Sequence, residues 1–166
     1  MDVVNHHSKI PDKTCCLDLS DFNHAPLPIA FPPPKKGVYI IRVMKKGDAV
    51  DAIFKNVNAL LVNFPWPYVR EYIEDRMNRL KNIGDCPVIY IGGAGVKAGS
   101  KNTLQDRVQE LANRHTISIP LWILVYFHWT LEYYWKVVDN PSDEENDLKK
   151  RYTAAHPRKR PALVVN

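Results

Sequence analysis

Two runs of β-branched and aromatic residues constrain the fold most, because segments with helical periodicity separate them along the chain. The first run begins with Gly-Val-Tyr at 37–39 and ends at a Lys-Lys-Gly-Asp turn. The second run ends in Tyr-Ile-Gly at 90–92. Runs of this composition predict strands. Between the two strands, apolar residues at helical spacing predict one helix within 50–64 and a second within 68–82.

The rest of the chain continues to alternate between helical and strand-like segments. A glycine-rich loop leads into a predicted helix at about 103–114, a strand is predicted at 131–138, and a last helix follows Asn140. The segment 120–129 is apolar on all sides, which leaves buried helix and strand both open. This order predicts an α+β fold with a small, mainly antiparallel β-sheet flanked by helices, and a helical insertion at about 48–85 between the first two strands.

The N-terminal residues differ from the rest in composition. Residues 1–36 carry several prolines, including the run at 32–34, and show no sustained periodicity. We expect an arm there that packs on the domain or binds a partner, closed by a stiff polyproline segment. One domain over 37–166 follows, in keeping with a total length of 166 residues.

The charge balance permits an anionic partner, because 23 Lys and Arg against 18 Asp and Glu give a formal net charge of +5. The cysteines, Cys15, Cys16 and Cys86, form no C-x-x-C pair, so we expect no disulfide framework, no structural zinc, and a reducing, cytoplasmic setting. The N-terminal region lacks the apolar core of a secretory signal. The longest apolar stretch, 121–127, is too short to cross a bilayer, so we expect no membrane partner.

The glycine-rich loop admits a nucleotide-binding interpretation. Residues 93–98 fit G-x-G-x-x-A after a strand and before a helix, where backbone amides attract phosphate. A dinucleotide fold also needs an acidic residue about 20 positions later, whereas Asn113, Arg114 and His115 stand there. No P-loop Gly-Lys-Ser or Gly-Lys-Thr follows either. A nucleotide-binding enzyme therefore stays the third hypothesis.

A set of motifs in a fixed order points elsewhere. They are the tripeptides at 37–39 and 90–92, Arg107, Glu145 with Leu148 behind it, and the closing pair Pro161 and Asn166. This order resembles the GIY-YIG nuclease family, and most closely its small standalone members. The resemblance covers 37–166 apart from the insertion. It implies a GIY-YIG-like fold and a metal-dependent endonuclease that hydrolyses DNA phosphodiester bonds.

The resemblance also implies a role for each motif residue. Tyr39 and Tyr90 would handle the attacking water, Arg107 would stabilise the phosphate, and Asn166 would support the site by hydrogen bonds. Glu145 would be the metal ligand, for Mg²⁺ or Mn²⁺. A free phenol has a pKa of about 10, so the tyrosines need a positive neighbour, such as Arg107 or a lysine, to act as a base at neutral pH.

Each of these residues also has an ordinary structural interpretation. A tyrosine on a strand is commonly a half-buried aromatic, and an arginine beside an apolar stripe commonly extends its charged end to solvent. Glu145 fits a capping box that begins at Ser142. Alternatively, Asn140 caps the helix and Pro141 takes its first position. The choice between Glu144 and Glu145 as the metal ligand stays open.

Several basic residues lie where they could contact a nucleic-acid backbone. They are Lys97, Lys101, His115, Lys149, Arg158 and Arg160. Phosphate contacts release counterions, so the affinity for DNA would fall steeply with salt. A double-strand cutter with one site per chain would act as a homodimer. The second hypothesis is a catalytically inactive nucleic-acid-binding protein that uses the same basic cleft.

Overall fold

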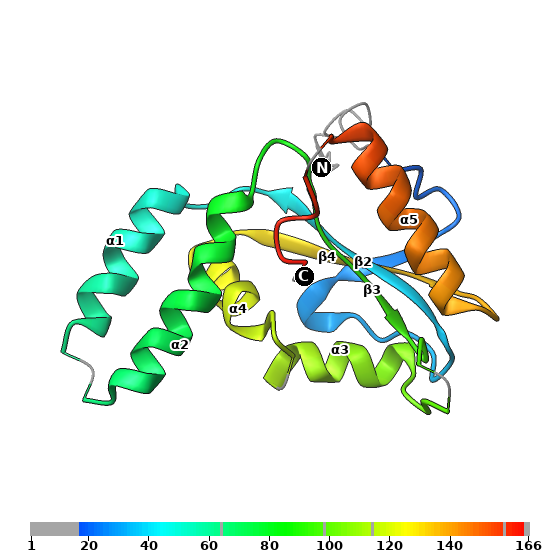
Figure 1. Cartoon of the computed structure of the whole chain (residues 1–166), viewed down its shortest axis with the longest axis horizontal. Helices are drawn as coiled ribbons and strands as arrows, with labels where there is room; N and C mark the ends of the chain where they lie inside the picture. The colour runs from blue at the N-terminus through cyan, green and yellow to red at the C-terminus, as the bar shows by residue number, and fades with distance from the viewer. Residues whose placement is uncertain (1–16, 64, 98, 114, 158, 165–166) are drawn as a thin grey trace, which may run out of the picture.

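The computed structural model describes residues 17–63, 65–97, 99–113, 115–157 and 159–164. In this part of the chain, a four-stranded antiparallel sheet carries five α-helices, and the predicted α+β class is confirmed (Figure 1).

The sheet is centred on the strand that begins with the first tripeptide. β2 (Gly37–Lys45) lies between β4 (Thr130–Val137) and β3 (Val88–Ala94), and β1 (Asn23–Pro26) pairs with the outer side of β4. All three pairings are antiparallel. Both tyrosine motifs are therefore on neighbouring strands, although a long segment separates them in sequence.

The prediction that a helical insertion separates the first two strands is wrong. β1 precedes β2, and in this fully described stretch only the 3₁₀ turn η2 (Leu27–Ile29) stands between them. The helices α1 (Val50–Leu61) and α2 (Pro67–Asn78) lie instead between the second and third strands, where the 3₁₀ segment η3 (Arg79–Asn82) continues α2.

The N-terminal segment from Leu17 onward belongs to the fold. Leu17, Phe22 and Ala30 are buried, and β1 takes its ladder hydrogen bonds from β4. The described part of the segment predicted to be an arm, 17–36, therefore contributes a strand to the sheet. Residues 1–16 lie outside the described part of the chain.

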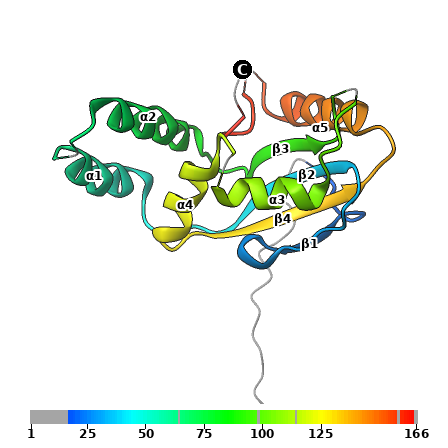
Figure 2. The ribbon, with the colours of Figure 1, turned by 90° about the horizontal axis from the view of Figure 1, so that it is seen from below.

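The helices cover both faces of the sheet. α3 (Leu104–Asn113) and α4 (Ser118–Tyr126) cover one face, and α5 (Pro141–Ala155) covers the other (Figures 1 and 2). Side chains alternate between the faces along each strand. Tyr39 and Ile41 therefore join the core under α3, while Val38 and Ile40 join the core under α5.

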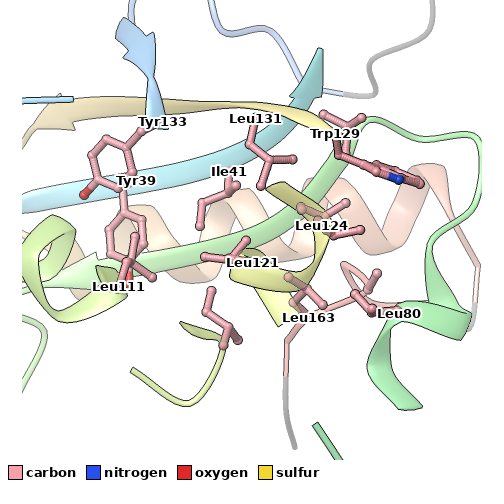
Figure 3. Packing of buried hydrophobic residues seen from close by; sticks show 14 of the residues in the cluster. Tyr39, Ile41, Leu80, Leu111, Leu121, Leu124, Trp129, Leu131, Tyr133 and Leu163 are labelled. Carbon is pink, nitrogen blue, oxygen red and sulfur yellow. The ribbon is translucent and has the colours of Figure 1, made fainter. Parts of the chain in front are cut away.

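The core under α3 and α4 extends from the tyrosines to the helical segment between β2 and β3. Figure 3 shows Tyr39 and Tyr133 together at one end of this cluster, with Leu80 and Leu163 at the other. Met77 and Leu80 are fully buried in it, so the end of α2 and η3 are held against the sheet. The parts of α1 and α2 that lie farther from the sheet project to one side of it (Figure 1).

Two undecided points of the sequence are settled by local geometry. The apolar segment after residue 117 forms α4. Asn140 caps α5, because its side-chain oxygen accepts a hydrogen bond from the Asp143 amide (3.4 Å), and Pro141 is the first helical residue. Glu145 consequently lies in the second turn of α5, where it is not needed as a capping group.

The residues before the C-terminus run beside the outer edge of β3. The Leu163 amide donates to the Ile89 carbonyl (2.9 Å), and Leu163 is buried in the core. Among the described residues, no helix has the length and apolar character that crossing a membrane requires.

Candidate active site

Two tyrosines form the centre of the candidate site. Tyr39 on β2 and Tyr90 on β3 have ring centroids 5.8 Å apart, and their hydroxyl groups are hydrogen-bond partners. Tyr133 on β4 stacks on the other side of Tyr39, with centroids 5.2 Å apart. Tyr39 is only 1% exposed, whereas Tyr90 is half-buried. Only Tyr90 of this hydroxyl pair can therefore meet solvent or a ligand.

The glycine that ends the second tripeptide makes room for this pair. Gly92 stands opposite Tyr39 in the antiparallel register. A Cβ atom at Gly92 would lie 2.7 Å from Tyr39 Cζ and 2.8 Å from its hydroxyl oxygen, and 2.7 Å from the Tyr90 ring. Because real side chains never approach so closely, residue 92 must be glycine for both rings to occupy these positions.

Arg107 reaches the tyrosines from α3. Leu104, one turn earlier, is fully buried, and Arg107 forms an ion pair with Glu110 on the same helix. Burial favours a lower pKa for Arg107, but the Glu110 carboxylate and the nearby phenols outweigh it and raise the pKa. The guanidinium is therefore charged. Its Nε is buried and has no hydrogen-bond acceptor among the described residues.

Glu145 approaches β3 from α5, on the face of the sheet opposite to the tyrosines. A Cβ atom at Gly93 would lie 2.5 Å from Glu145 Oε2, so the carboxylate lies directly against the backbone there. The Glu145 side chain is 14% exposed and forms an ion pair with Lys149. Glu144 points elsewhere and pairs with Lys136 (3.3 Å). Glu145, and not Glu144, is therefore the acid whose charge acts on Tyr90.

The phenols are neutral at physiological pH. Burial raises the pKa of Tyr39 well above its usual value. Burial also raises the pKa of Tyr90, and the charge of Glu145 adds to this effect, although Arg107 and Arg79 oppose it. The positive neighbours expected from the sequence are present, but they do not overcome desolvation. In the free protein both tyrosines are therefore neutral hydrogen-bonding groups.

His115 lies beside Tyr90 at the end of α3. Its ring meets the Tyr90 ring edge-on, with centroids 5.6 Å apart. Burial lowers the pKa of His115, and Arg107 and Arg79 lower it further, so the imidazole is neutral. The Ile117 amide donates to Nδ1 (3.4 Å), which places the ring proton on Nε2. His115 therefore offers a donor to an anion.

Arg79 is a site residue that the sequence analysis missed. It comes from η3, and its Nη1 donates to the Thr116 carbonyl (3.3 Å), next to His115. Its charge acts on Tyr90 and on His115. The sequence shows Arg79 only as one of several charged residues in a helical segment, and no local pattern indicates where that segment packs.

The remaining predicted residues are not all at the site. Lys97 and Lys101 are exposed on the loop between β3 and α3. Lys149 forms the ion pair with Glu145. Lys149 also lines a groove of about 610 Å³, together with Lys150 and Arg160. Asn166 and Arg158 lie outside the described residues, so their predicted roles stay predictions.

The donor set fits a divalent ion with a single protein ligand. Among the described residues, no group of three or more His, Cys, Asp or Glu side chains could hold a metal. Mg²⁺ does not require such a group, since it commonly binds one or two carboxylates, substrate phosphate and water. Glu145 would be the carboxylate of such a site, and in this structure it is paired with Lys149.

The structure thus brings Tyr39, Tyr90 and Arg107 together on the face of the sheet that α3 covers, with His115 and Arg79 beside them. Glu145 lies against Gly93 on the face that α5 covers, and its charge acts on Tyr90. This arrangement can hydrogen-bond and charge-stabilise an oxyanion at a half-buried surface. None of the family models, curated proteins or solved structures compared with this chain matches it.

Proposed function

We propose that this protein is a metal-dependent endonuclease of the GIY-YIG type, which hydrolyses phosphodiester bonds in DNA. The observation that carries the proposal is that Arg107, from α3, and Glu145, from α5, both act electrostatically on Tyr90 of β3. These groups suit phosphodiester hydrolysis, which requires an oriented water and positive charge for the developing oxyanion, because Tyr90 can orient a water, Arg107 is a cation and Glu145 could hold one.

In the proposed reaction each side chain has a separate task. The Arg107 guanidinium binds non-bridging phosphate oxygens, because it is permanently charged and presents several donors. The Tyr90 hydroxyl orients the water or a phosphate oxygen, because Tyr90 is half-buried whereas its partner Tyr39 is fully buried. Glu145 would hold the divalent ion, which, when bound, supplies Lewis-acid charge.

The distribution of basic side chains supports DNA as the substrate. Lys149, Lys150 and Arg160 line the groove between α5 and the C-terminal residues. A second groove next to it, of about 540 Å³, is lined by Lys81 and Lys159 as well as by Arg160. Two such grooves beside the Glu145–Lys149 pair suit a phosphate backbone that continues away from the reacting phosphate.

A plasmid-nicking assay tests the proposal. We expect the protein to nick supercoiled DNA in the presence of Mg²⁺ or Mn²⁺, and not in EDTA. We also expect binding to weaken steeply with added salt. One site cuts one strand, so linear product would indicate that two copies act together. Absence of nicking with every divalent ion tested, despite DNA binding, would contradict the endonuclease proposal.

One observation favours a second candidate, a catalytically inactive DNA-binding protein. The Glu145 carboxylate, which a metal would need, is already paired with Lys149. If that pair persists on DNA, the protein would bind without cleaving. Substituting Lys149→Gln separates the two cases, because it would restore metal-dependent nicking only if Lys149 blocks an otherwise intact site.

Gly93→Ala should impair the proposed reaction more than it impairs folding. A methyl group there would lie 2.3 Å from Val96 Cγ2 and 2.5 Å from Glu145 Oε2, so the Val96 side chain and the Glu145 carboxylate would both have to shift. Small displacements of a reacting group can lower rates about a hundredfold. We expect nicking to fall about ten- to a hundredfold, measured beside thermal unfolding.

Gly84→Ala is the matched control, because no heavy atom lies within 4 Å of its added Cβ. Equal nicking rates for the two glycine variants would contradict the placement of Glu145 against Gly93.

A further inference from the structure

The segment between β2 and β3 delivers a second guanidinium to the candidate site. Met77 and Leu80 are fully buried on either side of Arg79, so the backbone of η3 is fixed against the core. Arg79 Nη1 donates to the carbonyl of Thr116 (3.3 Å). The preceding residue, His115, has its ring 5.6 Å from that of Tyr90. Arg79 is thus fixed at the rim of the tyrosine pair.

Arg79 has no carboxylate partner among the ion pairs of the described residues. Arg107 pairs with Glu110, and Arg76 pairs with Asp75 (3.5 Å). Arg76 and Asp75 both act on Arg79 electrostatically, with opposite signs. Burial, and then the Arg76 charge, lower the pKa of Arg79, although Asp75, Tyr72 and Tyr90 oppose this effect. An anion bound beside Arg79 would supply the negative charge that no carboxylate provides in these ion pairs.

The donors present at this position suit phosphate. A guanidinium carries five N–H donors, of which Arg79 uses one on the Thr116 carbonyl. Neutral His115 offers its Nε2 proton beside it. Carboxylates, which would repel an anion, are engaged nearby in the Glu110 and Asp75 ion pairs.

We infer that Arg79 binds a second phosphate of the DNA strand, next to the phosphate that Arg107 binds. The inference rests on the proposed function for the identity of the polyanion. It assigns a binding role to the helical segment between β2 and β3, which the motif residues do not include.

The test compares DNA binding by full-length Arg79→Gln and wild type, in EDTA so that no cleavage occurs. A phosphate contact contributes about 0.9 to the slope of log K against log salt concentration, so we expect the slope to decrease by about one. Binding should weaken about tenfold or more, as for the loss of a charged hydrogen bond. Arg70→Gln is the control, because Arg70 lies on α2, is partly exposed and pairs only weakly with Glu74 (3.9 Å).

A slope for Arg79→Gln equal to that of wild type would overturn the inference, whatever happens to its thermal stability. If Arg79→Gln does not fold, Arg79→Lys decides the question. We expect it to keep the slope, since the charge remains, and to bind severalfold more weakly, since the planar fork is lost. Unchanged affinity for Arg79→Lys would then contradict the inference.

The two proposals fail in different ways. If wild type binds DNA but never cleaves it, the endonuclease proposal fails while the slope measurement still decides the role of Arg79. If wild type cleaves, Glu145→Gln does not, and Arg79→Gln binds and cleaves as Arg70→Gln does, only the Arg79 inference fails.

Discussion

Glu145→Gln should lower the rate of metal-dependent DNA nicking by about a hundred- to ten-thousandfold. The amide keeps the size of the side chain but removes the charge that a divalent ion needs. A catalytic metal contributes several kcal/mol to the transition state, and each ~1.4 kcal/mol changes a rate about tenfold. The measurement is the single-turnover nicking rate over a range of Mg²⁺ concentrations.

Glu144→Gln is the matched control for this prediction. It neutralises the adjacent acid on α5, but that acid pairs with Lys136, which in turn contacts Asp21 (2.7 Å). We therefore expect Glu144→Gln to nick at nearly the wild-type rate. If Glu145→Gln retained wild-type activity, or if Glu144→Gln lost as much, Glu145 could not be the metal ligand.

Arg107→Ala should lower the nicking rate by about a hundred- to a thousandfold, with a smaller effect on DNA binding. The loss of one preorganised donor to a developing oxyanion typically has this magnitude. Arg107→Lys should recover only part of the rate, because an ammonium group lacks the planar fork of the guanidinium. Rate constants at saturating DNA separate this effect from weaker binding.

Arg151→Ala provides a control arginine on α5, since Arg151 is partly exposed and pairs with Asp147 (2.9 Å). Arg107→Ala also leaves Glu110 without its partner, so thermal unfolding must be measured beside activity. A loss of activity that merely follows a loss of folded protein would remove Arg107 from the proposed mechanism.

Elements with a strong local signal could be predicted from the sequence, and others could not. The apolar stripe of α3 and the Asn-Pro start of α5 indicate helices without any tertiary information. α4 has no such signal, because Trp122 and Tyr126 are exposed and its apolar residues therefore form no stripe. β1 is short and mostly exposed, and it is a strand only because β4 pairs with it.

The residues of the candidate site also divide into those that the sequence indicates and those that only the folded structure identifies. Tyr39, Tyr90, Arg107 and Glu145 could be chosen from motif order alone, but their unequal burial could not. The competition between capping by Ser142 and by Asn140 depends on backbone geometry at the start of α5. Arg79 enters the site through the packing of η3 against the core, which is a property of the folded chain and not of its local sequence.

The placement of the tyrosines on β2 and β3 has a consequence for how the chain folds. These strands close a loop that contains α1 and α2, and β2 also pairs with the still more distant β4. Closing long loops lowers the entropy of the chain before ladder hydrogen bonds can form, which slows folding relative to helical proteins. Helical content should therefore return early in refolding, while the phenol pair, which requires strand pairing, should return late. A partly refolded chain would be helical yet lack the site.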